Sequence, residues 1–534
     1  VKVSIPKTVV LCTDVFDQFM DNNNLYQLAL SDAPDEEILQ AFIKAQLPDQ
    51  FIDDFKTFFE AIRHPIAIRS SSLLEDSHYQ PFAGIYSTYM IPYLDDKDEM
   101  LRMLAAAIKS VYASVYFKDS KAYMTATRNV IDQEKMAVIL QEVVGKQYGD
   151  HFYPNFSGVL RSINYYPLGY EKSEEGIASL ALGLGKYIVD GGQTLRVSPY
   201  HPTQVLQTSD MEIALRQTQT QFYALDMKRV GVDFKVDDGF NILKLKVKDA
   251  ENDGALNFIA STYDANDRVI RDGLYDGGRK IVSFNGVLRH GVFPLPELLK
   301  LSMHHGADSM RRPVEIEFAC TLNDDRTGEF YLLQIRPIVD SKQVLDQDIM
   351  TIPDDKCLLR SHNSLGHGVS DDIVDVVYVK TDENFTASDN PVVAMEVERI
   401  NKKFLADGKN YVLVGPGRWG SSDSWLGVPV KWPHISAAKL IVETKLKNYS
   451  VDPSQGTHFF QNLTSFGVGY FTIDENKGMG FFRKEILDAM PAVEETPHVR
   501  HVRFSKPLHI MMDGMKQEGL VICDTEDAKG NDAR

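Results

Sequence analysis

Hydrophobic positions in the first third of the chain recur with the spacing of helices that alternate with short strands. Residues 35–47 and 48–62 each place apolar side chains on one helical face, and residues 97–127 are also predicted to be helical. Residues 66–69 predict a short strand that enters a serine-rich turn, and residues 136–144 predict a second, buried strand. This alternation favours an α/β fold.

The middle of the chain predicts further strands and a β-hairpin. Residues 210–226 are predicted to be helical, and residues 242–247 alternate between apolar and polar side chains like a strand. A helix at 295–305 precedes two strands, Val314–Cys320 and Glu329–Arg336. The segment between them is rich in Asn, Asp and Gly, which favours a tight turn.

The polar segment around residues 340–356 predicts a domain boundary. We expect a first region at 1–340 with two or three subdomains, a linker at 341–356, a second α/β domain at 357–512 and a polar tail at 513–534. A chain of 534 residues is long enough for about three or four domains.

Composition narrows the classes of function. The chain is 43% hydrophobic and 25% charged, as in ordinary globular proteins. Its net charge of −18 argues against a nucleic-acid or membrane-surface binder, although a local basic pocket for a phosphorylated ligand is compatible with it. Uninterrupted apolar runs fall well short of 18 residues, so we expect no membrane-spanning segment. The four cysteines lack metal-site spacing, and we expect a cytoplasmic protein.

Arg69 is the first candidate for ligand binding. It lies at the end of the predicted strand and is followed by Ser70 and two further serines, with Gly84 further along the chain. A guanidinium group pairs with phosphate oxygens through two parallel hydrogen bonds, and turn amides and hydroxyls add donors. The alternative is an ordinary strand end with a surface arginine.

The predicted hairpin carries the second group of candidates. Alternation along a strand places Glu315 and Glu317 on one face, and it places Gln334 and Arg336 on one face of the partner strand. Carboxylate and amide oxygens suit Mg²⁺, and arginine neutralises phosphate charge. The alternative is a cross-strand salt bridge on a solvated sheet face.

Together, three segments resemble the nucleotide-binding half of the phosphoenolpyruvate synthase and pyruvate phosphate dikinase family. They are VSIPKTVVLCTDVFDQFM, IAIRSSSLLED with the following PFAGIYSTYM, and VEIEFACTLNDDRTGEFYLLQIRPI, in the family's order. The resemblance covers residues 1 to about 340 and implies an ATP-grasp fold whose two lobes close over ATP and Mg²⁺. The implied ATP-binding residues are Arg69, Ser70, Gly84, Gln141, Glu315, Glu317, Gln334 and Arg336.

The resemblance also implies individual roles. Arg69 would hold the phosphates, Arg336 would contact the transferring phosphoryl group, and Gln141 would lie where the family strand passes the adenine. Glu317 and Gln334 would be the metal ligands.

Two departures from the family pattern bear on activity. The family carries a glycine-rich segment with an ATP-binding lysine just before the point that corresponds to Val1. We expect the chain to begin inside a longer protein, and the alternative is that the lysine is lost. In the segment Gly183-Leu184-Gly185-Lys186, the family has an acidic residue that contacts the ribose where this chain has Lys186.

The second region contains a candidate phosphoryl carrier. A predicted strand at 438–443 is followed by Gly456-Thr457-His458, with Gly467 nine residues after the histidine. This pattern resembles the family's phosphohistidine domain and implies that His458 accepts a phosphoryl group. The alternatives are a structural histidine in an unrelated domain, and the rival acceptors His362 and His367.

These observations predict an ATP-dependent phosphotransferase of the phosphoenolpyruvate synthase type. The acceptor would be a small molecule such as pyruvate, bound by a domain outside this chain, because the roughly 190 residues after 340 are fewer than the about 250 of an α/β barrel. The competing hypothesis is an inactive ATP-binding regulatory or scaffolding module.

Overall fold

The chain folds into two compact units in the computed structural model. The first unit comprises Val1–Asn164, Gly169–Val189 and Gln193–Ile338, and the second comprises Tyr165–Leu168, Asp190–Gly192 and Val339–Arg534. The structure describes residues 1–72, 86–127, 134–164, 171–208, 211, 214–215, 218–228, 234–338, 349–381, 385–421, 423–445, 468–513 and 516–523.

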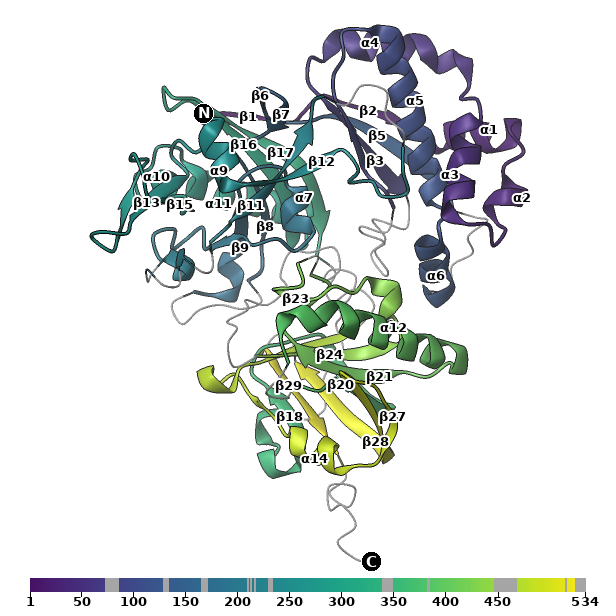
Figure 1. Ribbon diagram of the computed structural model, residues 1–534, viewed down its shortest axis with the longest axis vertical. Helices are drawn as coiled ribbons and strands as arrows, with labels where there is room; N and C mark the ends of the chain where they lie inside the picture. Colours follow the sequence, from purple (N-terminus) through teal and green to yellow (C-terminus); the bar gives the residue numbers. More distant parts are fainter. Residues whose placement is uncertain are drawn as a thin grey trace, which may run out of the picture. The chain divides into compact units, whose positions relative to one another are not determined.

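The beginning of the first unit is a helix-covered, four-stranded sheet (Figure 1). Its strands run in the order β2 (Thr8–Leu11), β5 (Met136–Glu142), β3 (Ile66–Ser72) and β4 (Tyr89–Ile91). The helices of this region are α1 (Thr13–Asn22), α2 (Tyr26–Ala29), α3 (Asp35–Lys44), α4 (Ile52–Ala61), α5 (Lys97–Ser114) and α6 (Lys118–Thr127).

Aromatic side chains join these helices to one another. The predicted apolar faces are buried, and the rings of Phe19 and Phe42 lie 5.8 Å apart, while Phe19 lies 5.4 Å from Tyr112. Helix α5 packs on β3, β4 and β5. The helical expectations for this region are therefore confirmed.

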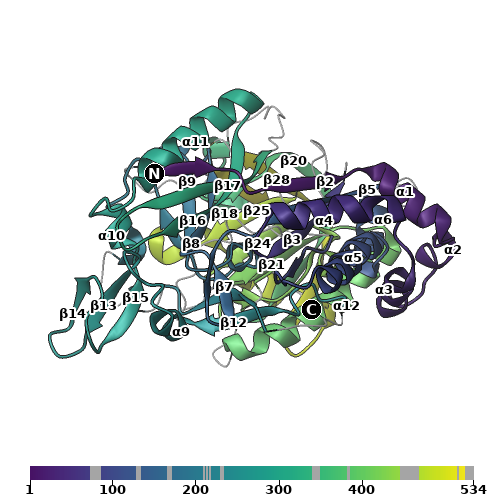
Figure 2. The ribbon, with the colours of Figure 1, turned by 90° about the horizontal axis from the view of Figure 1, so that it is seen from above.

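A six-stranded sheet forms the centre of the rest of the first unit. Its order is β1 (Lys2–Ser4), β17 (Gly328–Pro337), β16 (Val314–Leu322), β8 (Phe156–Arg161), β9 (Ile177–Ala181) and β10 (Leu195–Val197). The predicted hairpin is β16 and β17, which are antiparallel. Strand β1 is parallel to β17, whereas the next strand, β2, belongs to the helix-covered sheet. Figure 2 shows β1 and β2 running one after the other from the N-terminus.

Two smaller sheets complete the first unit. One has the order β12 (Ile242–Lys246), β11 (Gln221–Asp226), β7 (His151–Tyr153) and β6 (Lys146–Tyr148), and the other has the order β14 (Val269–Asp272), β13 (Ala260–Asp264) and β15 (Arg279–Val282). The accompanying helices are α7 (Lys186–Val189), α9 (Val247–Asn252), α10 (Asn285–Leu288) and α11 (Leu295–Met310).

Two local predictions were wrong. The second part of the segment 210–226 forms β11 rather than helix, because Phe222, Ala224 and Leu225 are buried and the strand pairs with β12 and β7. Tertiary pairing overrides weak local propensity in such segments. The serines after Arg69 are not in a turn, since β3 continues to Ser72 alongside β5.

One helical stretch among the described residues, Lys97–Ala122, is long and apolar enough to cross a membrane by length and composition alone. In this structure 72% of its apolar window is buried. It packs as a core helix of the first unit.

The second unit is built on one large mixed sheet. Its order is β19 (Ser364–Leu365), β25 (Gly469–Ile473), β24 (Ala438–Thr444), β21 (Tyr411–Pro416), β20 (His367–Val379), β28 (Val499–Asp513), β29 (Glu518–Ile522), β18 (Cys357–Ser361) and β26 (Phe481–Phe482), with β27 (Ala492–Glu495) beside β28. Strands β20, β21, β24 and β25 are mutually parallel. The long helix α12 (Asn390–Asp407) lies in the chain between β20 and β21, and α14 (Lys484–Ala489) precedes β27.

Candidate functional site

Arg69 lies in β3 at the point where the strand passes from buried apolar to half-buried polar positions. Ile66 and Ile68 are fully buried, whereas Arg69 and Ser70 are half-buried. Side chains alternate along a strand, so Arg69 shares a face with Ala67, whose partner on β5 is Gln141. Arg69 and Gln141 are therefore diagonal neighbours on one face of the helix-covered sheet.

The Arg69 guanidinium contacts side chains from the helix-covered sheet and from the six-stranded sheet of the first unit. Its Nη1 donates to Gln141 Oε1 at 3.3 Å, and its Nη2 donates to Gln334 Oε1 at 2.6 Å. The same Nη2 lies 3.6 Å from Glu317 Oε2. Side chains from three separate parts of the sequence, namely β3, β5 and the β16–β17 hairpin, thus meet around the Arg69 guanidinium.

The register of the hairpin explains why the polar side chains of β16 and β17 face one another. Glu315 is opposite Arg336, and Glu317 is opposite Gln334. The register shifts immediately afterwards, which leaves Leu333 as an extra residue on β17. The Leu333 carbonyl accepts a hydrogen bond from Gln141 Nε2 at 3.4 Å. The bulge therefore provides a second contact between the two sheets.

Glu315 is the buried centre of a row of charges across β8, β16 and β17. Arg161 donates from Nε and Nη2 to Glu315 Oε2 at 2.7 and 2.6 Å, and Arg336 donates from Nε and Nη2 to Oε1 at 2.9 and 2.5 Å. Burial alone would raise the pKa of Glu315, but the two guanidinium groups outweigh burial and lower the pKa to about 2. Glu315 is therefore ionised at neutral pH and orients both arginines.

Glu317 lies between the two candidate phosphate-binding arginines. Its carboxylate oxygens are 3.6 Å from Arg69 and 3.7 Å from Arg336, and 17% of its side chain is exposed. Together with the Gln334 amide oxygen, this carboxylate forms an oxygen donor set. Mg²⁺ is usually held in kinase-type sites by one or two carboxylates, with waters and substrate phosphates as further ligands. The residues present fit a Mg²⁺ ion that arrives with a polyphosphate.

The glycine-containing turn after β9 is held tightly against β11. Gly183 has a φ of +86°, and a Cβ there would lie 2.6 Å from the Tyr223 carbonyl oxygen, so only glycine fits. Leu184 N donates to the same carbonyl at 3.0 Å. Lys186, the residue that departs from the family pattern, lies 3.5 Å from a carboxylate oxygen of Asp238. An acidic residue is thus present beside this turn, supplied by another segment.

The structure brings together six of the predicted ATP-binding residues, namely Arg69, Gln141, Glu315, Glu317, Gln334 and Arg336. Ser70 lies next to Arg69 in β3, and Gly84 lies outside the described residues. Sequence reasoning missed Arg161 and Asp238. Neither residue lies in a motif, and only the register of β8 with β16 reveals that Arg161 reaches Glu315.

The histidine candidates of the second unit are described only in part. His458 and Gly467 lie outside the described residues. The His362 Nδ1 atom lies 2.8 and 2.9 Å from the two carboxylate oxygens of Glu518. His367 begins β20. Trp419 is fully buried against Gly415.

Comparison with known proteins identifies the family of the first unit. The family "Pyruvate phosphate dikinase, AMP/ATP-binding domain" matches residues 1–356, about two thirds of the chain. This chain belongs to that family. It is also 27% identical over 190 residues to "Uncharacterized phosphotransferase YvkC" of Bacillus subtilis (strain 168), a match that covers 36% of this chain and 20% of the relative. The chain thus spans about a fifth of that relative's length.

Membership in the pyruvate phosphate dikinase family agrees with the architecture. The mixed α/β fold with several sheets is consistent with the ATP-grasp type that the sequence motifs predicted. The family match supports binding of ATP, and together with the relative it supports ATP-dependent phosphoryl transfer at the level of the family. The cluster around Arg69 has the guanidinium, carboxylate and amide groups that such chemistry uses.

Proposed function

We propose that the chain is an ATP-dependent phosphotransferase of the phosphoenolpyruvate synthase type, whose first unit binds Mg-ATP at the cluster around Arg69 and Arg336. One observation carries the proposal. Arg69 from β3 meets Gln334 and Glu317 from the β16–β17 hairpin at 2.6 and 3.6 Å, so side chains from two sheets converge on a small volume. Convergent polar groups together with a residue whose pKa is strongly shifted, here Glu315, are typical of a binding site.

The two half-buried arginines, Arg69 and Arg336, would act on different phosphates. Arg69 binds and orients the polyphosphate, and Arg336 stabilises the charge on the phosphoryl group that is transferred. Glu315 holds the Arg336 guanidinium in place through two hydrogen bonds to one carboxylate oxygen. A fixed guanidinium loses little freedom when the transition state forms.

Glu317 and Gln334 would hold Mg²⁺ together with the phosphates. The metal would neutralise phosphate charge in the same region as the two arginines. The Gln334 amide oxygen accepts from Arg69 in this structure, so it must exchange that hydrogen bond for the metal. Gln141 lies beside Arg69 on the predicted adenine side of the site.

His458 is the proposed carrier. Its imidazole nitrogen would attack a phosphorus of ATP, the bond to the leaving phosphate oxygen would break, and a phosphoramidate would form. The phosphoryl group would then pass to a small acceptor such as pyruvate, bound by a domain outside this chain. We place this activity in the cytoplasm.

A second candidate function is a regulatory module that binds ATP without converting it to products. Lys186 motivates it, because this residue reverses the charge expected beside the nucleotide. The Lys186–Asp238 contact argues against it, because it balances that charge locally. Conversion of ATP to AMP and phosphate, as opposed to binding alone, distinguishes the two functions.

The test measures ATP binding by calorimetry and product formation by chromatography, both with Mg²⁺. Arg336→Ala removes charge-assisted contacts worth about 1.5–3 kcal/mol, so affinity or turnover should fall roughly ten- to hundredfold. Arg102→Ala is the matched control, because this exposed arginine of α5 has no side-chain partner among the described residues. Equal loss in both variants, or no ATP binding by the unaltered chain, would overturn the proposal.

A further inference from the structure

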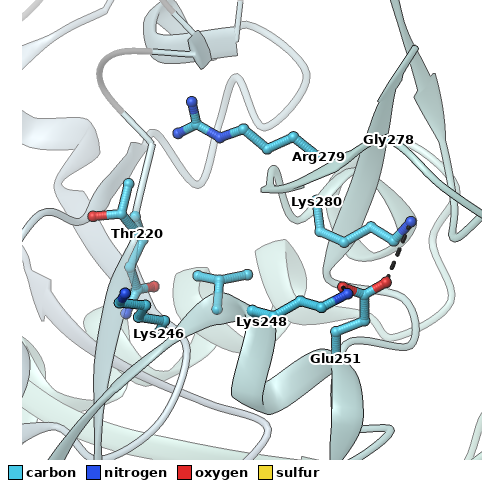
Figure 3. Close-up of a pocket in the computed structure, with 9 residues that line it drawn as sticks. Thr220, Lys246, Lys248, Glu251, Gly278, Arg279 and Lys280 are labelled. Atoms are coloured by element: carbon cyan, nitrogen blue, oxygen red, sulfur yellow. Dashed lines mark hydrogen bonds and ion pairs between the residues drawn. The ribbon is translucent and has the colours of Figure 1, made fainter. Parts of the chain in front are cut away.

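A cavity of about 240 Å³ in the first unit is lined by residues that take no part in the candidate ATP site (Figure 3). It lies where the start of β11, the end of β12, the start of α9 and the start of β15 come together. The lining residues are Gln219, Thr220, Lys246, Val247, Lys248, Glu251, Gly278, Arg279 and Lys280.

The cavity is strongly basic in a chain that is acidic overall. Four cationic side chains line it, and Glu251 is the one carboxylate among its lining residues, so its formal charge is +3. Figure 3 shows Arg279 extending across one side of the cavity, with Lys246 and Lys248 on the opposite side. Like charges that line one cavity repel one another, and an anion between them offsets the repulsion.

Glu251 balances only part of this charge. Its Oε2 pairs with Lys248 at 3.0 Å and its Oε1 with Lys280 at 3.5 Å. The Lys280 amino group, on a side chain that is only 5% exposed, also donates to the carbonyls of Tyr275 and Gly277. Burial alone would raise the pKa of Glu251, but the two lysines outweigh it and lower the pKa, so the carboxylate stays charged.

Lys246 and Arg279 are positioned to meet a ligand. Neither charged group has a hydrogen-bond or ion-pair partner within the part of the chain that the structure describes. Lys246 is the last residue of β12, where it pairs with Gln221. Gly278 has a φ of +69°, and a Cβ there would lie 2.4 Å from the Tyr263 carbonyl oxygen. The glycine thus permits the tight turn that brings Arg279 to the cavity.

We propose that this cavity binds a small phosphate-bearing anion. A phosphate group carries about two negative charges at neutral pH and accepts several hydrogen bonds, which suits a guanidinium fork and an ammonium group on opposite walls. The volume of about 240 Å³ lies below the roughly 300–1,000 Å³ of pockets for drug-sized ligands. This space is of the size that suits inorganic phosphate or a small phosphate ester.

The test is calorimetric titration of the full chain with inorganic phosphate and, separately, with glycerol 3-phosphate, with glycerol as the uncharged comparison. The double variant Lys246→Gln/Arg279→Gln should bind both anions about ten- to hundredfold more weakly, because two charge-assisted contacts are lost. The variant Lys44→Gln/Arg102→Gln is the matched control, since it removes the same charge from exposed positions outside the cavity.

Phosphate can also bind the candidate ATP site, so a third variant separates the two sites. The variant Arg69→Gln/Arg336→Gln should still bind inorganic phosphate and glycerol 3-phosphate at the cavity, and this binding should still be weakened by the further substitutions Lys246→Gln and Arg279→Gln. Tighter binding of glycerol 3-phosphate than of inorganic phosphate would identify an organic ester as the ligand, and the reverse would identify the free ion. Unchanged affinity in the cavity variant, affinity lost only in the Arg69/Arg336 variant, or no anion binding by the unaltered chain would overturn the proposal.

Discussion

Replacing Arg161 with methionine should destabilise the first unit by about 3 kcal/mol at pH 7. The substitution keeps much of the side-chain volume but leaves the buried Glu315 carboxylate with one guanidinium instead of two. The lowering of the Glu315 pKa from 4.5 to about 2 is the combined effect of Arg161 and Arg336 against burial, and at 1.36 kcal/mol for each pKa unit it corresponds to about 3 kcal/mol. It sets the order of magnitude for the loss of one of the two partners. Removal of one partner from a buried ion pair typically costs about 3–5 kcal/mol, which is the same range.

The distribution of tryptophan provides an internal control for this measurement. The three tryptophans, Trp419, Trp425 and Trp432, all lie in the second unit. Urea unfolding followed by far-ultraviolet circular dichroism reports on both units, whereas tryptophan fluorescence reports on the second. With a slope of about 3 kcal/mol per molar urea, the circular dichroism transition of the first unit should shift by about 1 M and the fluorescence transition should not move.

The change of this stability difference with pH follows from the direction of the Glu315 pKa shift. The folded pKa of Glu315 lies below its unfolded value, so ionised Glu315 stabilises the fold above pH 4.5, and this stabilisation is lost as the pH falls towards 2. The difference between Arg161→Met and the unaltered chain should therefore be constant above about pH 5 and shrink as the pH falls from 4.5 towards 2. The double variant Arg161→Met/Glu315→Met should recover part of the lost stability, because it no longer contains a buried carboxylate that is paired with only one of its two arginines. A shift of both transitions, or a difference independent of pH, would refute the reasoning.

Three further predictions follow from other residues. Burial raises the pKa of Glu443 to about 7, so the folded state loses stability as the pH rises from 5 to 8, and Glu443→Gln should flatten that dependence in fluorescence-monitored unfolding. Gly149→Ala should destabilise the chain by roughly 1–2 kcal/mol, because Gly149 has a positive φ. Gly183→Ala should cost more, because an added Cβ there would also collide with the Tyr223 carbonyl, and melting curves of the two variants test the difference. Incubation with ATP labelled at the β or γ phosphate should yield acid-labile protein label that His458→Ala abolishes, and label that persists in that variant would point to another acceptor.

The sequence predicted the hairpin and the pairing of its polar side chains because both depend on local alternation. Val314–Leu322 and Gly328–Pro337 pair as expected, with Glu315 opposite Arg336 and Glu317 opposite Gln334. The bulge at Leu333 could not be foreseen, since it depends on the fit between two strands rather than on the pattern within either.

Residues that enter the site through long-range packing were not predictable in the same way. Arg161 looks like an ordinary strand-end arginine until β8 is placed beside β16. Asp238 lies 52 positions from Lys186 in a segment without a motif. The helix expected at 210–226 was wrong over Gln221–Asp226 for a related reason, because strand partners on both sides outweigh local preference.

The two short strands at the start of the chain tether the halves of the candidate ATP site. Ser4 ends the strand beside β17, and Thr8 begins the strand beside β5, so three residues connect the two large sheets of the first unit. A connection of this length spans at most about 14 Å when fully extended. This connection keeps Arg69 and Gln334 from drifting far apart. The two half-sites therefore face each other at a high effective concentration, and a ligand that bridges them loses little entropy in bringing them together.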